Sequence, residues 1–498
     1  MKHDCGVDQE IGEFDLGNGN QLVGVLKLAG PQTSLTLHSK EFFHPIAAPG
    51  GFIRGLLRDL TKVSLIDCIS PGAGTVSKGE ERSYIADVFP HFVVSGTEYA
   101  APSEKTISHT NFIIDDATTL FYDFDAFGSV IDARPLIREV VRANKLDREI
   151  QIGDHPQIQY FTGRHEIFRA DTCIGRVSAH HSPSWSFPGP RGVHIKNRIR
   201  VSVDFQDCER FHDVIDQVYV LRDYFGLLVG RPQKLREIHI QSGKNSDSPA
   251  MLKVHWSLCP TRTKASNQQH PHPADVLIDA VRCKEEFSRV LGNWLQRQAD
   301  WRGARHRFFG IFAEQRTYDV NRLIGAANMF DILPPTAVPT DVELPQELLE
   351  AKTKARILFK ALDPSPERNS VLSALGRLGK ASLKRKVYAR AQIVLDAMPS
   401  RFPDLLAVLD HAVDCRNYFV HGGDPPLDYE KNSQIIWFFV DTLEFIFAAS
   451  DLIEAGWDIN AWNARTSISH PFGRYIRSYI GQTALLKPLS NKQAGTRF

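Results

Sequence analysis

The sequence predicts an α+β protein in which a β-rich region is followed by an all-helical bundle. Up to about residue 260, apolar residues mostly alternate with polar ones, which is the period of a half-buried strand. From about Val276 they recur at spacings of three and four residues, and prolines separate the segments. The segment Gln268 to Pro273, Gln-Gln-His-Pro-His-Pro, lies between the two patterns and indicates a linker. A chain of 498 residues is long enough for two or three domains with separate cores.

Strand periodicity is clearest from Val193 to Phe205. One predicted face carries Val193, Ile195, Ile199, Val201, Val203 and Phe205, and the other carries His194, Lys196, Arg198 and Arg200. Leu252, Val254, Trp256 and Leu258 repeat the alternation, with Lys253 and His255 opposite. Between these strands, helical spacing predicts one helix from Phe211 to Phe225.

A turn-rich loop at residues 181–192 could divide the β-rich region into two subdomains. It contains Trp185 and Phe187. If exposed, these aromatic side chains would form a recognition surface, and if buried they would anchor the loop.

Six helices are predicted in the second half. They are Lys284 to Ala299, Tyr318 to Phe330, Gln346 to Ala361, Leu372 to Met398, Phe402 to Val420 and Glu430 to Ala455. The expected domains are therefore residues 1–272, β-rich; residues 273–470, helical; and residues 471–498, a C-terminal tail.

Composition favours a cytoplasmic protein. Seven scattered cysteines without a C-x-x-C pair indicate a reducing compartment. The most apolar segment, Ile435 to Leu452, contains Asp441, Glu444 and Asp451, so we expect a buried bundle helix and no membrane span. The paired histidines His180-His181 and His270-x-His272 lack a completing carboxylate or cysteine, and no Walker A loop or dinucleotide fingerprint is present. We therefore expect no metal and no cofactor.

The residues most suited to catalysis are Arg416, Asn417 and His421, at the end of the helix that glycines at 422 and 423 terminate. Cleavage of RNA by its own 2′-hydroxyl needs one proton removed, one proton supplied and a stabilised phosphate. Histidine can transfer both protons near neutral pH. Arginine can hold the phosphate through two oriented hydrogen bonds, and asparagine can add a neutral one.

The spacing from Arg416 to His421 places the two side chains on one broad side of a helix, roughly 140° and 7.5 Å apart. They would need a groove or a partner subunit to converge. A structural role is the alternative, because arginine and histidine near a helix C-terminus often cap carbonyl groups.

A basic segment precedes the motif. Residues 351–400 contain eleven Lys or Arg and three Asp or Glu, a local net charge of +8 in a chain whose overall formal charge is +1. The densest part predicts an RNA-binding surface at Lys380, Lys384, Arg385, Lys386 and Arg390. A solvated helix face without a ligand is the alternative.

The R-N-x-x-x-H pattern on a long helix of an all-helical region resembles the HEPN superfamily. The N-terminal region resembles the ApeA family of anti-phage proteins through Ile11 to Phe14, Leu22 to Leu28, Leu35 to Leu37, Tyr84 to Val88 and Phe112 to Asp115. This resemblance implies a metal-independent endoribonuclease that pairs as a homodimer or higher even oligomer, with Arg416 stabilising charge, Asn417 orienting and His421 acting as acid or base.

The resemblance also implies cleavage of cellular RNA, tRNA being the expected substrate, to a 2′,3′-cyclic phosphate in abortive infection. The N-terminal domain would restrain the activity until a phage-derived trigger binds. The alternative is a non-catalytic protein that uses the HEPN domain for dimerisation and for RNA or partner binding.

Overall fold

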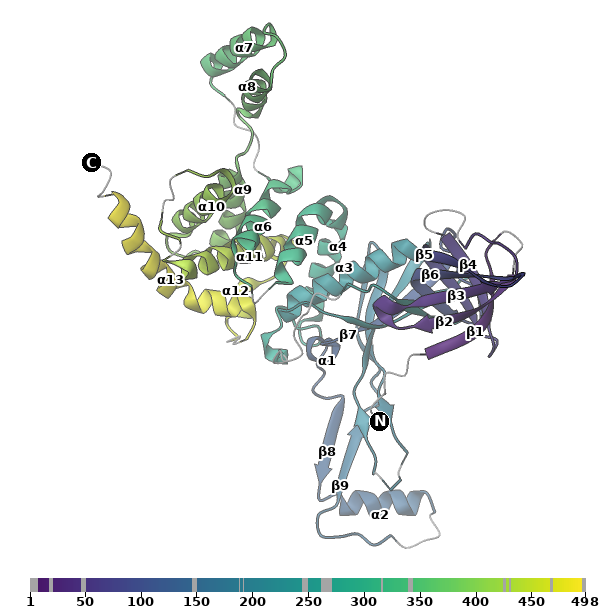
Figure 1. The fold of residues 1–498 in the computed structure, drawn as a ribbon. Helices are drawn as coiled ribbons and strands as arrows, with labels where there is room; N and C mark the ends of the chain where they lie inside the picture. The colour runs from purple at the N-terminus through teal and green to yellow at the C-terminus, as the bar shows by residue number, and fades with distance from the viewer. Residues whose placement is uncertain are drawn as a thin grey trace. The chain divides into compact units, whose positions relative to one another are not determined.

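The computed structural model describes residues 8–17, 21–45, 51–145, 150–187, 189–190, 192–243, 250–260, 271–314, 317–338, 344–423, 427–429, 431–465 and 469–494. The chain divides into two compact units, residues 1–292 and 293–498. The first unit is built on β-sheets and the second is helical (Figure 1), which confirms the predicted fold class. The first half of the predicted linker, residues 268–270, lies outside the described residues, and its second half leads into a 3-10 turn at Pro273–Asp275.

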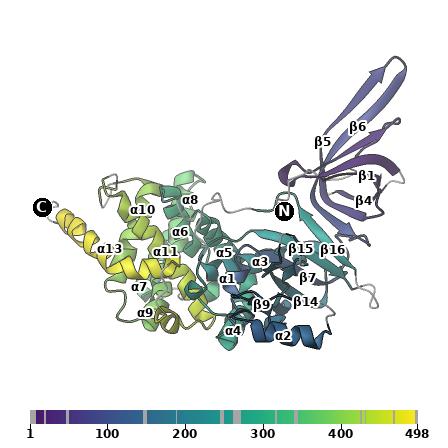
Figure 2. The same ribbon diagram turned by 90° about the horizontal axis from the view of Figure 1, so that it is seen from below.

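Six strands at the start of the first unit form a closed ring. Their order is β6-β3-β2-β1-β4-β5, and β5 pairs again with β6. Figure 2 shows β5 and β6 continuing as a long pair beyond the other strands of the ring. The interior is apolar, with Phe14, Leu35, Leu37, Leu65 and Val88 at its centre. The strands are β1 (Asp8–Asp15), β2 (Gln21–Leu28), β3 (Ser34–Ser39), β4 (Gly51–Leu57), β5 (Lys62–Lys78) and β6 (Glu81–Gly96).

Strand β6 also begins an open sheet, because the edge that pairs with β3 near Val88 pairs with β16 from Phe92 to Ser95. The sheet continues in the order β16-β15-β7-β14-β11-β10. Helix α3 (Phe211–Val229) packs against β7 and buries Val214, Val218 and Phe225. The strands are β7 (Ile107–Ile114), β10 (Glu166–Thr172), β11 (Gly175–His181), β14 (Ile199–Glu209), β15 (Leu235–Ser242) and β16 (Met251–Trp256).

Smaller elements complete the first unit. Helix α1 (Ala117–Leu120) precedes a separate two-stranded sheet of β8 (Phe127–Ile131) and β9 (Gln157–Phe161), with helix α2 (Arg134–Ala143) between them in the chain. A second short pair, β12 (Ser184–Trp185) and β13 (Ile195–Lys196), lies in the connection between β11 and β14. Its aromatic side chains are exposed, Trp185 by 59% and Phe187 by 93%. Anchoring by burial is therefore ruled out for both.

The strand predictions hold in the interior and fail at the margins. Ile199, Val201 and Val203 are buried as expected, but Val193 is 63% exposed because it lies in the β12–β13 connection. Leu252 and Val254 are buried, whereas Leu258 follows the end of β16 and is exposed. The loop at residues 181–192 joins β11 and β14, which are neighbours in one sheet, so it does not separate two subdomains.

The second unit is a bundle around α11, whose residues from Ile435 to Leu452 are almost all buried. Helices α6, α9, α10 and α13 contact α11. No helix among the described residues is long and apolar enough to cross a membrane. The helices are α4 (Lys284–Gln296), which spans the division, α5 (Gln298–Phe312), α6 (Val320–Asp331), α7 (Gln346–Lys360), α8 (Pro366–Arg377), α9 (Leu383–Ala397), α10 (Leu405–His421), α11 (Ser433–Glu454), α12 (Ile459–Asn463) and α13 (Pro471–Ala494). Short 3-10 turns lie at Pro335–Ala337 in this unit and at Gly30–Gln32 and Pro273–Asp275 in the first unit.

Two helix predictions differ from the structure. The predicted helix Leu372 to Met398 is two helices, because Gly379 adopts a φ of 93° and Ser382 caps the start of α9. The segment expected to be a C-terminal tail is α13, which buries Tyr475 and Tyr479 against Phe402 and Phe438.

Candidate active site

The apolar side of helix α10 packs inside the bundle, so Arg416, Asn417 and His421 lie on sides of the helix that are not fully buried. Leu405, Val408, Leu409, Ala412, Val413 and Cys415 are buried. The helix ends where Gly422 adopts a φ of 77° and a ψ of −164°, a conformation that side chains disfavour, and the Gly422 N–H donates to the Tyr418 carbonyl at 2.8 Å. His421 is therefore the last helical residue.

Arg416 is held by side chains from its own helix and from α6. One terminal nitrogen donates to Asn417 Oδ1 at 3.0 Å, and the other donates to Asn328 Oδ1 at 2.7 Å. The second nitrogen also lies 3.7 Å from Asp331 Oδ2. The Arg416 side chain is 14% exposed. The guanidinium is thus fixed in orientation while part of it remains open to solvent.

Asn328 and Asp331 were not predicted as site residues. They lie in the last turn of α6, 88 and 85 residues before Arg416 in the chain. Besides Arg416, Asp331 has a second cationic neighbour, Lys386 of α9. Lys386 donates to the Asp331 backbone carbonyl at 2.8 Å and lies 3.8 Å from its carboxylate. The only sequence signal is a pair of polar residues at the end of an apolar helix, which does not indicate their partner.

His421 stands apart from this cluster. It is exposed, and among the residues that the structure describes none makes a hydrogen bond or an ion pair with its ring. Tyr418 and Phe419, in the turn before it, both pack on Tyr429, with ring centroids 5.7 and 5.6 Å away. The end of α10 is therefore anchored by aromatic contacts, and the imidazole is free to meet a ligand.

The predicted basic surface is partly used within the bundle. Lys384 lies 2.9 Å from Asp410 and from Asp414, both on α10. Burial opposes the charge of Lys384, but hydrogen bonds with the two carboxylates raise its pKa. Arg385 is half-buried, with its backbone N–H capped by Ser382, and Lys380 is exposed. Lys380 is therefore the most accessible cation of the predicted surface.

Arg390 does not belong to a surface. It is 1% exposed, donates to Ser450 Oγ at 2.9 Å and pairs with Glu454 at 2.8 Å. It sits on the side of α9 that faces α11, beside Val387 and Val394. Arg390 therefore does not bind RNA as the sequence suggested; it joins α9 to α11 inside the bundle.

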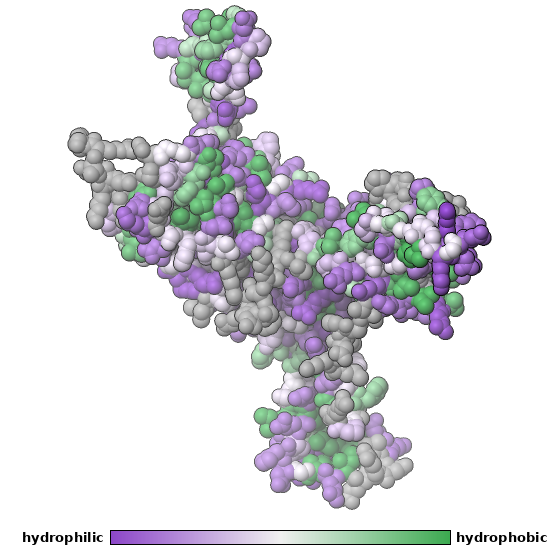
Figure 3. Space-filling model, viewed as in Figure 1, coloured by the Kyte–Doolittle hydropathy of each residue, from purple (hydrophilic) through white to green (hydrophobic). Residues whose placement is uncertain are grey.

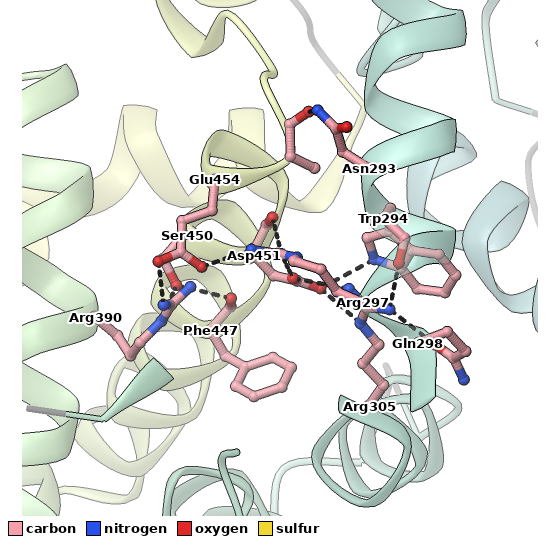
Figure 4. A network of polar contacts seen from close by, with 11 residues as sticks. Asn293, Trp294, Arg297, Gln298, Arg305, Arg390, Phe447, Ser450, Asp451 and Glu454 are labelled. Carbon is pink, nitrogen blue, oxygen red and sulfur yellow. Dashed lines mark hydrogen bonds and ion pairs between the residues drawn. The ribbon is translucent and has the colours of Figure 1, made fainter. Parts of the chain in front are cut away.

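Arg390 is one part of a buried polar network at the end of α11 (Figure 4). Asp451 accepts hydrogen bonds from Arg305 at 2.9 and 3.0 Å and from Trp294 at 3.0 Å, and it also pairs with Arg297. Burial would raise the pKa of Asp451, but Arg305 and the other arginines lower it below its usual value. The network joins α4, α5, α9 and α11 and stabilises the bundle that carries α10.

Among the described residues, no group of three His, Cys, Asp or Glu side chains is arranged to hold a metal ion. The groups that could act on a ligand at the end of α10 are instead a guanidinium, two amides, a carboxylate and an exposed imidazole.

The helical bundle around α11 has the sequence of a HEPN domain. Residues 324–461 match the Apea-like HEPN model, and residues 9–294 match ApeA N-terminal domain 1. The chain belongs to the ApeA family and carries a C-terminal HEPN domain. Comparison with curated proteins and with solved structures gives no match.

Proposed function

We propose that this protein is a metal-independent endoribonuclease of anti-phage defence, acting through Arg416, Asn417 and His421. The observation that carries the proposal is the fixed guanidinium of Arg416 on the helix that ends in an exposed His421. HEPN domains are generally ribonuclease domains, and the match over residues 324–461 supports this activity.

In the proposed reaction, one His421 imidazole removes the proton from a ribose 2′-hydroxyl. The 2′-oxygen attacks the adjacent phosphorus, and the bond to the 5′-oxygen breaks as a second imidazole supplies a proton. The products are a 2′,3′-cyclic phosphate and a 5′-hydroxyl. Arg416 stabilises the charge on the phosphate, while Asn417 orients its guanidinium.

The two imidazoles come from two protomers. Arg416 and His421 of one chain are half of the proposed site, and the α10 end of a second protomer in a homodimer or higher even oligomer completes it. HEPN domains commonly dimerise, which supports the pairing. The substrate is cellular RNA, with tRNA as the expected class, and the β-rich unit restrains cleavage until a phage-derived trigger binds.

A second candidate is a non-catalytic binding protein. The observation that favours it is the contact of Arg416 with Asn328 and Asp331, because an arginine held by a neighbouring helix can be purely structural. In that case the HEPN domain would serve for dimerisation and for RNA or partner binding.

Cleavage of total tRNA in EDTA separates the two candidates. Wild type, Arg416→Ala and His421→Ala are compared in the presence and absence of extract from phage-infected cells. His306→Ala and Arg307→Ala, at exposed positions of α5, are the matched controls. We expect cleavage by the wild type and both controls, with cyclic-phosphate ends, and none by the site variants. Intact RNA in every reaction would remove the ribonuclease proposal.

A further inference from the structure

The end of α6 places one carboxylate between two cations from other helices. Asp331 is the last residue of α6, and its Oδ2 lies 3.7 Å from a terminal nitrogen of Arg416 on α10. Its Oδ1 lies 3.8 Å from the ammonium group of Lys386 on α9. The two cations therefore face different oxygens of the same carboxylate.

This carboxylate is held loosely. Hydrogen bonds between oppositely charged groups are about 2.7–2.9 Å long, so neither contact is one. Within the described part of the chain, no group donates a hydrogen bond to the Asp331 side chain, which is 41% exposed. Ion pairs of this length and exposure contribute little to stability. Another anion can therefore displace the carboxylate from the two cations.

The position of Asp331 does not suit its own helix. The last turn of a helix carries partial negative charge on its free carbonyl groups, so it favours a cation and disfavours a carboxylate. Lys386 supplies the favoured charge, because its ammonium donates to the Asp331 backbone carbonyl at 2.8 Å. The carboxylate at this position is explained better by the neighbouring cations than by the stability of α6.

Both cations keep donors for a further ligand. A guanidinium has five N–H groups, and Arg416 uses one on Asn417 and one on Asn328. Its Nε is buried and has no hydrogen-bond partner among the residues that the structure describes. Lys386 has three N–H groups and is 18% exposed. Arg416 is thus fixed in orientation, with donors to spare beside a second cation.

A phosphodiester matches the anion that these cations already face. It carries one negative charge shared by two oxygens, as a carboxylate does, and both arginine and lysine bind phosphate. A phosphate that is not tied to α6 can approach each cation to hydrogen-bond distance. Figure 3 shows hydrophilic side chains among hydrophobic ones on the face of the α6, α9 and α10 region that is in view.

We propose that Arg416 and Lys386 bind one phosphate group of the RNA, and that the Asp331 carboxylate occupies this place until RNA arrives. The inference rests on the ribonuclease proposed above, because the phosphate site contains Arg416. Asp331 competes with the phosphate for the same two cations and therefore weakens RNA binding. A strand is retained only if its other contacts are strong enough to displace the carboxylate.

The test is binding of the full chain to RNA that cannot be cleaved. The probe is a short fluorescein-labelled oligonucleotide with a 2′-O-methyl group on every ribose, so that no 2′-hydroxyl can attack. Fluorescence anisotropy gives the dissociation constant for the wild type, Asp331→Asn, Lys386→Gln and the double variant. Circular dichroism checks that each variant is folded.

Asp414→Asn is the matched control. Asp414 is on α10, its side chain is also 41% exposed, and it pairs with a lysine, Lys384, at 2.9 Å. The control therefore removes an equally exposed negative charge from the same bundle without changing the proposed phosphate site.

We expect Asp331→Asn to lower the dissociation constant roughly 10-fold, because it removes a like charge within a few ångströms of the phosphate. Lys386→Gln should raise it by a similar factor. In the Lys386→Gln background, Asp331→Asn should have much less effect, since the two cations no longer form one site. Asp414→Asn should leave the dissociation constant nearly unchanged.

Three results would overturn the proposal. Unchanged or weaker binding by Asp331→Asn would mean that the carboxylate only holds Arg416 in place. Equal tightening by Asp414→Asn would reduce the effect to the overall charge. Absence of binding by both the wild type and Asp331→Asn would remove the site. Tighter binding by Asp331→Asn, with unmodified RNA left intact by every variant, would support the phosphate site and contradict only the ribonuclease.

Discussion

Arg416 is positioned by a neighbouring helix as well as by Asn417 of its own helix. Its shortest hydrogen bond, 2.7 Å, is to Asn328 of α6, and its contact with Asp331 comes from the same turn. A helix that carries a reactive arginine near its end has several rotamers open to that side chain. Contacts from α6 select one of them, so Asn328 acts through Arg416.

Asn328→Ala should lower RNA cleavage about 10-fold, because a lost hydrogen bond to a charged group costs roughly 1.5 kcal/mol. Single-turnover rates measure the effect, and RNA affinity should change less than the rate. Asn328→Asp keeps an acceptor oxygen and should retain most of the activity.

Asn321→Ala, at an exposed position of the same helix, is the control. Equal rates for the variants at 321 and 328 would show that the contact with Arg416 does not contribute to cleavage.

Asp451 is the residue on which the bundle depends most. Asp451→Asn would leave Arg305 buried without its counter-charge and would remove one of the two carboxylates that pair with Arg297, so we expect a loss of about 3–5 kcal/mol in the free energy of unfolding. Urea denaturation measures it. Asp396→Asn, at an exposed position of α9, should change stability by less than 0.5 kcal/mol or so. A small effect at 451 would mean that the arginines find other partners.

The three candidate catalytic residues were predictable from the sequence, and the residues that contact Arg416 from α6 were not. Arg416, Asn417 and His421 stand together in the chain with a glycine stop after them, so spacing identifies them. Asn328 and Asp331 reach Arg416 only through the packing of α6 on α10, which no local pattern encodes. Arg390 was misassigned because a basic helix does not reveal which of its cations faces α11.

At the scale of the element, the end of α10 depends on Gly422. Its φ of 77° and ψ of −164° lie in a region that is essentially restricted to glycine. Gly422→Ala should cost about 1–3 kcal/mol of unfolding free energy and should also reduce cleavage, because His421 precedes the strained residue. Thermal unfolding and tRNA cleavage give the two readouts.

Gly376→Ala should stabilise the protein, whereas Gly422→Ala should destabilise it. Gly376 lies inside α8 with open space around a new Cβ, so alanine should stabilise that helix by about 0.5–1 kcal/mol. If both glycine variants behaved alike, the conformation at 422 would not be the cause.

Asp441, in the middle of helix α11, makes the stability of the folded state depend on pH. Burial, with nearby Glu444, raises the pKa of Asp441 from 3.8 to about 6, while Tyr318 donates to its carboxylate at 2.9 Å. The folded state therefore prefers the protonated carboxyl. The stabilisation is complete below pH 3.8 and is lost as the pH rises to about 6.

Asp441→Asn should remove this pH dependence of stability, because asparagine remains neutral. Relative to the variant, the wild type should lose on the order of 2 kcal/mol between pH 4 and pH 7, measured by urea unfolding at both pH values. Asp363→Asn, at an exposed position after α7, is the control. A constant difference between wild type and the Asp441 variant would contradict the raised pKa.

Helices with a clear apolar pattern were predictable, α11 among them, and helices whose buried side also carries polar or basic side chains were not. The predicted helices at Phe211, Tyr318 and Phe402 begin within a few residues of α3, α6 and α10. Helix α5 was missed because it presents Arg305 and Trp301 to the interior, so its pattern is not simply apolar against charged. Helix α13 was expected to be a tail for a similar reason, since its buried side mixes Tyr475, Tyr479 and Thr483 with Phe472, Ile476 and Leu486.

For the whole molecule, the charge of the HEPN domain predicts a measurable salt dependence. If RNA contacts about three cations, its affinity should fall roughly 20-fold from 50 to 200 mM salt. Lys380→Ala should make this dependence shallower, because Lys380 is exposed. Lys384→Ala should alter it little, since Asp410 and Asp414 already hold that ammonium group. Equal slopes for the two variants would contradict this division of the basic segment.

The order of the two halves and the family were predictable from the sequence, because strand and helix periods change once and the motif lies in the helical part. The closed ring was not, since ring closure depends on which strands pair at a distance. Alternation assigns faces to β1 and β6 but says nothing of whether β5 returns to β6.

Strand β6 has a consequence for synthesis of the chain. The ring can close once residue 96 has been made, but on the edge of β6 that pairs with β3, the part from Phe92 to Ser95 stays open until β16 is available. Val94 waits for Val254, 160 residues later in the chain. During that interval the nascent chain presents an unpaired apolar strand edge to every other chain being made nearby. Slow translation of the middle of the sequence would therefore promote aggregation before the β-rich unit is complete.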